Sequence, residues 1–173
     1  MDLWTVIDRR HSVRCFGPAE VSASMVHRIL AAATRAPSAG NLQPWHFVVV
    51  RRDEVKRALA EAAYGQSFVA QAPVVIVVCA EPERSAMGYG SRGRNLYCLQ
   101  DTAAAIEHIL LAATALGLGA CWVGAFDERA AARALGLSST LRPVAMVPMG
   151  QPVAEPVGQT ARRPLSAVTS FVE

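Results

Sequence analysis

Lysine is almost absent from this sequence: Lys56 is the only one among 17 basic residues, so arginine carries nearly all of the positive charge. The formal net charge is only +3, and no continuous basic face with interleaved aromatic residues is visible, which argues against a nucleic-acid-binding protein. The four cysteines form no CxxC pair and the four histidines form no HExxH motif. Neither a disulfide framework nor a zinc site is therefore expected.

Long apolar runs are absent as well. No run approaches the roughly 20 residues that a membrane-spanning helix needs, and the start of the chain lacks the basic and apolar segments of a secretory signal. The 173 residues are 52% hydrophobic and 18% charged, which is typical of one globular domain with a full core. We therefore expect a single domain over residues 1–173 in a cytoplasmic protein that makes no membrane contact.

Apolar periodicity predicts an α+β fold, with a mixed sheet surrounded by helices. The unbroken β-branched run from Val74 to Cys79 predicts a strand that is buried on both faces. Helices are expected over residues 2–9, 22–36, 53–63, 95–118 and 127–135. Further strands are expected over residues 46–50, 120–126 and 144–149, with 167–172 as a candidate last strand.

The predicted helix from Asn95 to Leu118 carries apolar residues on every face. A helix of this kind must be buried all round, and a domain of this size covers only part of it with its own sheet. A second copy of the chain would cover the remainder, so we expect a homodimer with this helix at its interface. His108 within it is interpreted as a core or interface residue and not as a catalyst.

A short basic segment follows the first predicted helix. It contains Arg10, His11, Ser12 and Arg14. Guanidinium, hydroxyl and backbone N–H groups at such a turn can hold a phosphate dianion, although an ordinary solvated basic face has the same composition. Arg162 and Arg163 form a second small cluster, and two such clusters fit one phosphate better than a nucleic-acid groove.

The segment from Pro37 to Trp45 joins a predicted helix to a predicted strand. Two prolines and a glycine in nine residues disfavour regular structure, while Ser38, Asn41 and Gln43 supply hydroxyl and amide groups. Such a rigid polar loop suits a flat ligand with polar edges. Taken alone, it would also fit an ordinary tight connection.

Residues Gly88 to Gly93 match the pattern G-x-G-x-x-G. In a dinucleotide site the glycines come directly after a strand, and an acidic residue ends a second strand about 20 residues later. Here eight residues separate Cys79 from Gly88, and one long helical pattern follows. We interpret the segment as a flexible loop and not as a dinucleotide site.

Taken together, these stretches resemble the FMN-dependent nitroreductase family, in particular its compact bacterial and archaeal members. Four matching stretches come in the family's order and spacing and span nearly the whole chain. They are Arg9 to Phe16, Ala36 to Trp45, Cys121 to Phe126, and Arg162 to Leu165. The resemblance implies an α+β fold that dimerises through the long helix, with FMN at the interface bound by residues of both subunits.

The family likeness also implies a role for each stretch. The phosphate and ribityl chain of FMN would be held by Arg10, His11, Ser12 and Arg14, with Arg162 and Arg163 adding guanidinium groups. The isoalloxazine ring would be lined by Pro37, Ser38, Ala39 and Asn41 of the opposite subunit. Val123 and Gly124 would pass beside flavin N5, with the Gly124 N–H as donor, and Gln66 would reach the pyrimidine edge. Only the short loop from Tyr89 to Arg94 would cover the flavin.

The activity implied by the likeness is reduction of nitroaromatics, quinones or related small acceptors by NADH or NADPH in a ping-pong scheme. Because the flavin carries the redox chemistry, no catalytic side chain is expected, and Cys15, Cys121 and His108 should be replaceable. Two alternatives stay open: a flavin-fragmenting enzyme of the dimethylbenzimidazole synthase type, and a module that binds FMN without turnover. The sequence does not distinguish NADH from NADPH.

Overall fold

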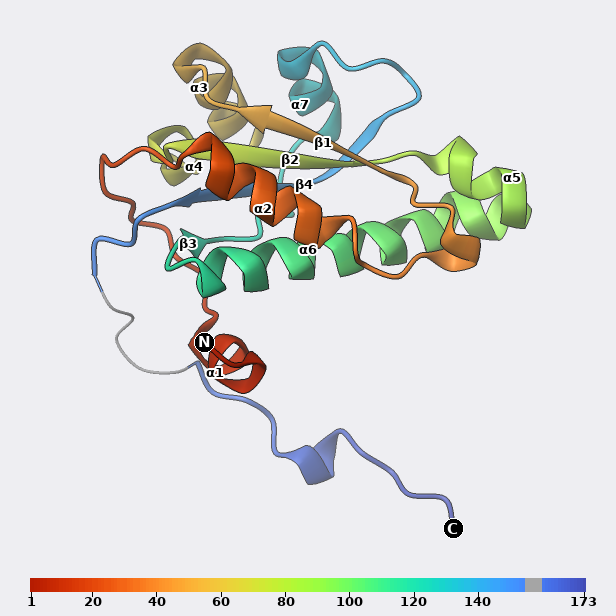
Figure 1. Ribbon diagram of the computed structural model, residues 1–173. Helices are drawn as coiled ribbons and strands as arrows, with labels where there is room; N and C mark the ends of the chain where they lie inside the picture. Colours follow the sequence, from red (N-terminus) through yellow and green to blue (C-terminus); the bar gives the residue numbers. More distant parts are fainter. Residues whose placement is uncertain (155–159) are drawn as a thin grey trace.

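A four-stranded sheet forms the centre of the computed structural model, which describes residues 1–154 and 160–173 (Figure 1). The strands are β1 (Trp45–Val50), β2 (Val74–Ala80), β3 (Gly119–Ala120) and β4 (Arg142–Gly150), in the order β1-β2-β4-β3. Neighbouring strands are antiparallel, and the parallel component expected of a mixed sheet is the isolated bridge between Ser12 and Ala120. With helices on both faces of the sheet, the α+β prediction is confirmed.

Strand β2 is buried along its whole length, as its β-branched run predicts. Alternate side chains point to opposite faces of the sheet and belong to two separate apolar cores. Val74, Ile76 and Val78 pack with α2 (Ala23–Ala33) and α6 (Cys98–Ala115), and the residues between them pack with α3 (Asp53–Ala62) and α7 (Glu128–Leu135). The sheet is thus the middle layer of three.

Several helices begin where the sequence places a capping residue. Asp2, Ser22 and Asp127 accept backbone N–H bonds at the N-termini of α1 (Leu3–Arg9), α2 and α7, and so satisfy donors that have no partner inside the helix. The remaining short pieces are η1 (Ala39–Asn41), α4 (Phe68–Gln71) and η3 (Leu165–Ala167).

The segment that matches G-x-G-x-x-G is helical, so its interpretation as a flexible loop is wrong. It ends α5 (Pro82–Arg92) and begins a π-helix, η2 (Gly93–Tyr97). Two of the glycines are needed for lack of space: a Cβ on Gly88 would lie 2.8 Å from Leu42 Cδ1, and a Cβ on Gly93 would lie 2.3 Å from the Ser85 carbonyl oxygen. The third, Gly90, has φ +55°, a backbone conformation that favours glycine. The segment is built for close packing.

Two expected strands are also wrong in extent. Within the predicted strand over residues 120–126, only Ala120 belongs to a strand, paired together with Gly119 just before it, and Val123 makes one further bridge to Met146. The candidate last strand at 167–172 does not form, because residues 160–173 are exposed and hold only the short turn η3. A lone segment without a neighbouring strand has no partner for its backbone groups.

The outer face of α6 is only partly covered. Leu99, Ala103 and Leu111 are half-buried in the single chain and take no part in the apolar cores of the described residues. His108 lies half-buried, with Nδ1 2.9 Å from the Ala32 carbonyl oxygen, as expected of a packed residue. Within the described ranges, none of the helices combines the length and apolar character needed to cross a membrane.

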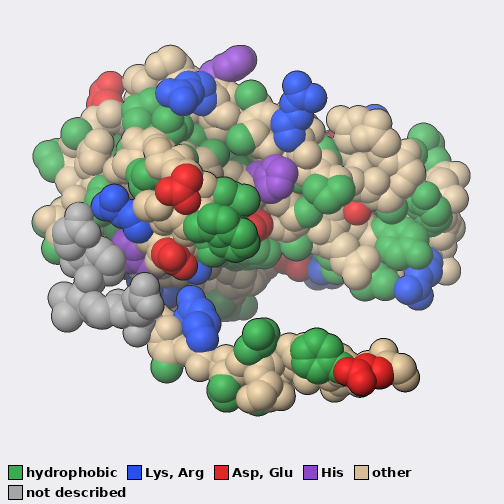
Figure 2. Space-filling model, turned by 60° about the horizontal axis from the view of Figure 1, so that its bottom comes forward, with side chains coloured by type: hydrophobic (Ala, Val, Ile, Leu, Met, Phe, Trp, Pro, Cys, Tyr) green, Lys and Arg blue, Asp and Glu red, His purple; other side chains and the backbone are tan. Residues whose placement is uncertain are grey.

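The C-terminal segment 160–173 projects from the body as an arm (Figure 2). Hydrophobic side chains lie along it: Phe171 is 86% exposed, and Leu165 and Val168 are exposed as well. In a single chain these apolar side chains stay in contact with water, and burying them against another surface would be favourable.

Lys56 anchors α3 to the end of α4. Its side chain is 7% exposed, and its ammonium group donates to the Ala72 carbonyl oxygen at 2.8 Å and pairs with Asp53 at 3.0 Å. Replacing it in Lys56→Met leaves that carbonyl without its charged donor, so we expect the free energy of unfolding to fall by about 1.5 to 3 kcal/mol in urea denaturation. Arg57→Ala is the matched control, since its exposed pair with Glu54 at 3.7 Å should contribute under about 1 kcal/mol. Equal effects of the two changes would contradict the anchoring role.

Candidate functional site

The segment after α1 and the segment after β3 run side by side. The Val13 N–H donates to the Ala120 carbonyl oxygen at 2.9 Å, and Ser12 forms the parallel bridge to Ala120, the residue before Cys121. Gly119 allows this approach, since a Cβ there would lie 2.7 Å from a Val13 methyl group. Two stretches more than 100 residues apart in sequence therefore meet at one place.

The basic residues of the first stretch surround this junction. The Arg14 guanidinium lies 5.8 Å from the ring centroid of Phe68, in a cation–π contact. Arg10 follows α1 and places Nε 3.9 Å from a carboxylate oxygen of Glu107 on α6. The His11 Nδ1–H donates to the Arg9 carbonyl oxygen at 2.8 Å.

Val123, Gly124 and Gln66 lie around the same junction. Val123 exchanges backbone hydrogen bonds with Met146 at 2.9 and 3.0 Å, which fixes the segment to β4. The Gln66 amide donates to the Ala125 carbonyl oxygen at 3.2 Å. Gly124 is exposed, and its N–H makes no hydrogen bond to the described part of the chain. We call this assembly the basic half-site; it consists of Arg10, His11, Ser12, Arg14, Gln66, Val123 and Gly124.

The second group of predicted residues lies in a tight turn before β1. We call Pro37, Ser38, Ala39 and Asn41 the turn half-site. Gly40, Asn41 and Gln43 all have φ between +51° and +56°. Left-handed backbone costs a residue other than glycine about 1 to 2 kcal/mol, so the conformation needs support from its surroundings.

Support comes from α5 and α6. The Asp101 carboxylate accepts the Ala39 N–H at 3.1 Å, and Arg84 Nε donates to the Leu42 carbonyl oxygen. Within the turn, the Ser38 hydroxyl accepts the Gln43 N–H at 3.0 Å.

The two half-sites of one chain lie at opposite ends of α6 (Figure 1). Asp101 in the first turn of α6 contacts the turn half-site, whereas β3, which follows the last turn, contacts the basic half-site. The 14 helical steps from Asp101 to Ala115 span roughly 20 Å at a rise of 1.5 Å each. One chain therefore brings seven of the predicted residues together and holds four of them apart.

The remaining two predicted residues belong to the C-terminal arm. Arg162 donates to the Thr160 carbonyl oxygen at 2.9 Å, and Arg163 donates to the Ala167 carbonyl oxygen at 2.8 Å. Both sets of contacts are internal to the arm, and both side chains are exposed.

Known proteins resemble this chain in sequence and architecture. The profile of the nitroreductase family matches residues 7–70 and 61–151. A protein of Archaeoglobus fulgidus, named as a candidate NADH dehydrogenase/NAD(P)H nitroreductase, is 37% identical over 151 residues, which cover 85% of this chain and 83% of that one. The NADH dehydrogenase of Thermus thermophilus is 34% identical over 182 residues, covering 90% and 89%. A crystal structure of a nitroreductase family protein from Clostridium novyi NT superposes with a TM-score of 0.81 at 36% identity, covering 88% and 86%.

The chain belongs to the nitroreductase family. The matched ranges contain both half-sites and end before the C-terminal arm, so the nitroreductase match bears on the body of the protein. The predicted resemblance is confirmed.

Four residues near the nitroreductase half-sites were not predicted. Trp122 is 40% exposed, with its indole Nε1 3.7 Å from where a Cβ on Gly124 would lie. Phe68 lies beneath Arg14, and Asp101 and Arg84 hold the turn half-site. Only Asp101 had a signal in the sequence, as a carboxylate on a helix that is apolar on every face.

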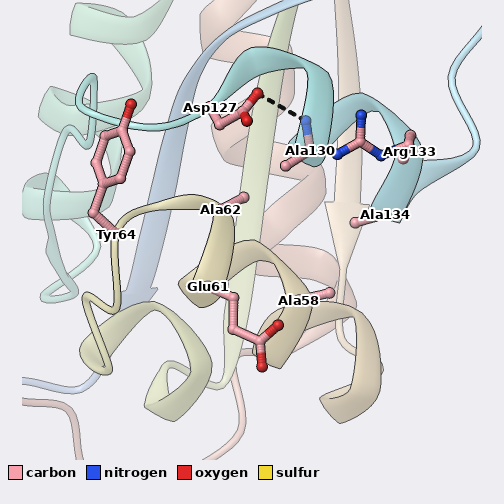
Figure 3. Close-up of a pocket in the computed structure, with 8 residues that line it drawn as sticks. All are labelled: Ala58, Glu61, Ala62, Tyr64, Asp127, Ala130, Arg133 and Ala134. Carbon is pink, nitrogen blue, oxygen red and sulfur yellow. Dashed lines mark hydrogen bonds between the residues drawn. The ribbon is translucent and has the colours of Figure 1, made fainter.

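A shallow depression lies between α3 and α7 (Figure 3). Its walls are alanines with Glu61, Tyr64 and Arg133 around them. The Asp127 carboxylate is already used in capping α7, with bonds to the Arg129 and Ala130 N–H groups. None of the predicted nitroreductase site residues lines this depression.

The four cysteines are free thiols, and three are buried. Burial raises the pKa of the Cys79 thiol to about 12 and also raises the pKa values of the Cys98 and Cys121 thiols, with Arg14 and Ser12 partly opposing the shift at Cys121. A raised pKa keeps a thiol protonated, and the thiolate is the nucleophile. We therefore expect iodoacetamide at pH 8 to modify the native protein once, at the exposed Cys15, and the urea-denatured protein four times.

Mass spectrometry of intact protein measures the number of adducts. Cys15→Ser is the control and should give none in the native state. Rapid native alkylation of Cys121 would show that its thiolate is accessible.

Proposed function

We propose that this protein is an FMN-dependent NAD(P)H oxidoreductase of the cytoplasm that reduces nitroaromatics, quinones or related small acceptors. The observation that carries the proposal is the exposed Gly124 N–H, which lacks a partner within the described residues and directly precedes Ala125, whose carbonyl oxygen accepts the Gln66 amide. The names of the relatives above, which include NADH dehydrogenase and NAD(P)H nitroreductase, support the donor and the acceptor class.

The donor groups of the basic half-site fit FMN. A phosphate needs guanidinium and hydroxyl donors, which Arg10, Arg14 and Ser12 supply. A flavin ring edge needs neutral hydrogen-bond groups, which the Gly124 N–H and the Gln66 amide supply. The cofactor, once bound, would accept a hydride from a reduced nicotinamide and pass electrons to the acceptor.

The chain's own groups would bind, orient and shield. The Gly124 N–H would donate to the ring, and the arginines would stabilise negative charge as it develops there. Trp122 and Val123 would exclude water from one side. No side chain is required to act as acid, base or nucleophile, so nicotinamide and acceptor would use the same space in turn.

A homodimer would complete the site. One chain holds its two half-sites roughly 20 Å apart along α6, so neither can serve the other within the same subunit. Antiparallel packing of α6 against a second copy would bring the turn half-site of one subunit to the basic half-site of the other. The half-buried outer face of α6 and the exposed apolar arm support such an assembly, and the arm would also carry Arg162 and Arg163 toward a phosphate.

Anaerobic titration of the purified protein tests the proposal. The protein, purified with FMN, should lose its flavin absorbance near 450 nm on addition of NADH or NADPH. Adding a nitroaromatic or a quinone should then restore the flavin absorbance. Initial-rate lines at several acceptor concentrations should run parallel.

Other outcomes would point elsewhere. Flavin that neither nicotinamide reduces would indicate a binding module without turnover. Irreversible loss of flavin during aerobic turnover would indicate a flavin-fragmenting enzyme. Intersecting initial-rate lines would reject the ping-pong order.

A further inference from the structure

The turn half-site has an unusual support on α6. Asp101 is 7% exposed, and only one of its carboxylate oxygens has a partner, the Ala39 N–H at 3.1 Å. The other oxygen, Oδ2, is buried without a hydrogen bond to any described residue. Burial raises the pKa of this carboxyl group, as expected when charge is removed from water.

A buried, half-satisfied carboxylate is costly to the fold, and packing alone does not need it. Its neighbour Thr102 is also buried, yet its hydroxyl is satisfied by the carbonyl oxygens of Cys98 and Leu99 in its own helix. The Asp101 carboxylate instead accepts its one hydrogen bond from outside the helix. The donor is the Ala39 N–H, 62 residues away in sequence.

That turn needs holding in place. Asn41 and Gln43 have positive φ without being glycine, and Gly40 has φ +56° at a position where a Cβ would lie only 2.8 Å from the Tyr89 hydroxyl oxygen. Strained backbone persists only where its surroundings determine it, and it is concentrated at functional sites. Arg84 on α5 donates a hydrogen bond to the Leu42 carbonyl oxygen. Two side chains, those of Asp101 and Arg84, therefore bind the backbone at the two ends of residues 39–42.

We propose that Asp101 is a positioning residue that fixes the turn half-site in the shape required to form one wall of the partner subunit's flavin site. This inference rests on the proposed function. Asp101 lies on α6, the helix expected at the dimer interface. Its hydrogen bond from the Ala39 N–H therefore links that helix directly to the turn half-site. Arg84 assists from α5.

Three variants test this role. Asp101→Ala removes the acceptor, Asp101→Asn keeps an Oδ1 acceptor for the Ala39 N–H, and Thr102→Val is the matched control for losing a buried polar group at the next position. Alanine is the strongest helix former, so α6 should persist in Asp101→Ala. Arg84→Ala, at an exposed side chain, gives a further variant with no change in the core.

Hydrogen–deuterium exchange of the FMN-free protein is the first measurement. In Asp101→Ala we expect the amides of residues 38–43 to exchange about tenfold faster or more, while Asp101→Asn and Thr102→Val stay close to wild type. The second measurement is FMN affinity by fluorescence titration, which should weaken about tenfold in Asp101→Ala, less in Arg84→Ala, and recover in Asp101→Asn. This rescue separates positioning from general destabilisation.

Two results overturn the inference. One is unchanged exchange of residues 38–43 in Asp101→Ala, and the other is normal FMN affinity in that variant despite a loosened turn. Equal losses in Thr102→Val and Asp101→Ala would likewise reduce the role to core packing and reject it. A wild-type protein that binds no FMN would reject the proposed function itself, whereas normal wild-type binding with normal Asp101→Ala binding rejects only the inference.

Discussion

Arg14→Ala is expected to weaken FMN binding by about 10- to 100-fold, because it removes a charge-assisted contact of about 1.5 to 3 kcal/mol. Arg14 is exposed and lies over the Phe68 ring, two residues after Ser12, which bridges to Ala120. Its loss leaves the cores intact, so the effect should fall on cofactor binding and not on folding. Titration of FMN-free protein with FMN, followed by flavin fluorescence, measures the affinity.

Two further variants make this result specific. Arg14→Lys keeps the charge but loses the planar fork that can contact two phosphate oxygens at once, so its affinity should lie between those of wild type and Arg14→Ala. Arg28→Ala removes an exposed arginine from α2, away from both half-sites, and should bind FMN normally. Normal affinity in Arg14→Ala would mean that other residues hold the phosphate.

Ala103→Arg should yield a folded monomer that retains almost no FMN. Ala103 is half-buried on the outer face of α6, outside the apolar cores, so the single chain has room for the larger side chain. In a dimer packed through α6, the same arginine would be a buried and unpaired charge that costs about 3 to 5 kcal/mol. The dissociation constant of the dimer should rise by about 100- to 4,000-fold.

Light scattering after size-exclusion chromatography gives the mass, and absorbance near 450 nm gives the flavin content. Ala132→Arg is the matched control: it places the same change at a half-buried alanine of α7, on the other side of the sheet, and should stay dimeric with FMN. A monomeric Ala103→Arg with full FMN and full turnover would contradict the shared site.

The layers of the fold follow from patterns that are local in sequence. The β-branched run at Val74 predicts β2 because a strand buried on both faces needs apolar residues at every position. Ser22 and Asp127 predict helix starts because their side chains satisfy free backbone donors.

The misses arise where a distant neighbour decides the local structure. Gly88 and Gly93 suggest a loop by composition, yet they lie in helices, on either side of a kink at Gly90, and they are glycine because Leu42 and the Ser85 carbonyl group leave no space for a Cβ. The segment from Cys121 to Phe126 has the composition of a strand, but its ladder stops after Ala120 and resumes only at the single bridge from Val123 to Met146.

The site residues also divide into those that the local sequence identifies and those that only the fold identifies. The arginines and the polar loop could be identified because their chemistry is visible in the residue types. Asp101 and Arg84 could not be assigned to the turn, since only the fold brings them to Ala39 and Leu42. Trp122 has no distinguishing context until its indole is placed beside Gly124.

The length of α6 has a consequence for how this protein could change over time. Each residue added to an α-helix advances its end by 1.5 Å and rotates it by about 100°. An insertion between Asp101 and Ala115 would swing β3 and the Ser12 junction out of line with the Ala39 turn, whereas an insertion in an exposed loop would displace neither. In the proposed dimer every such error would occur twice, once at each site. The residue count of α6 should therefore resist change.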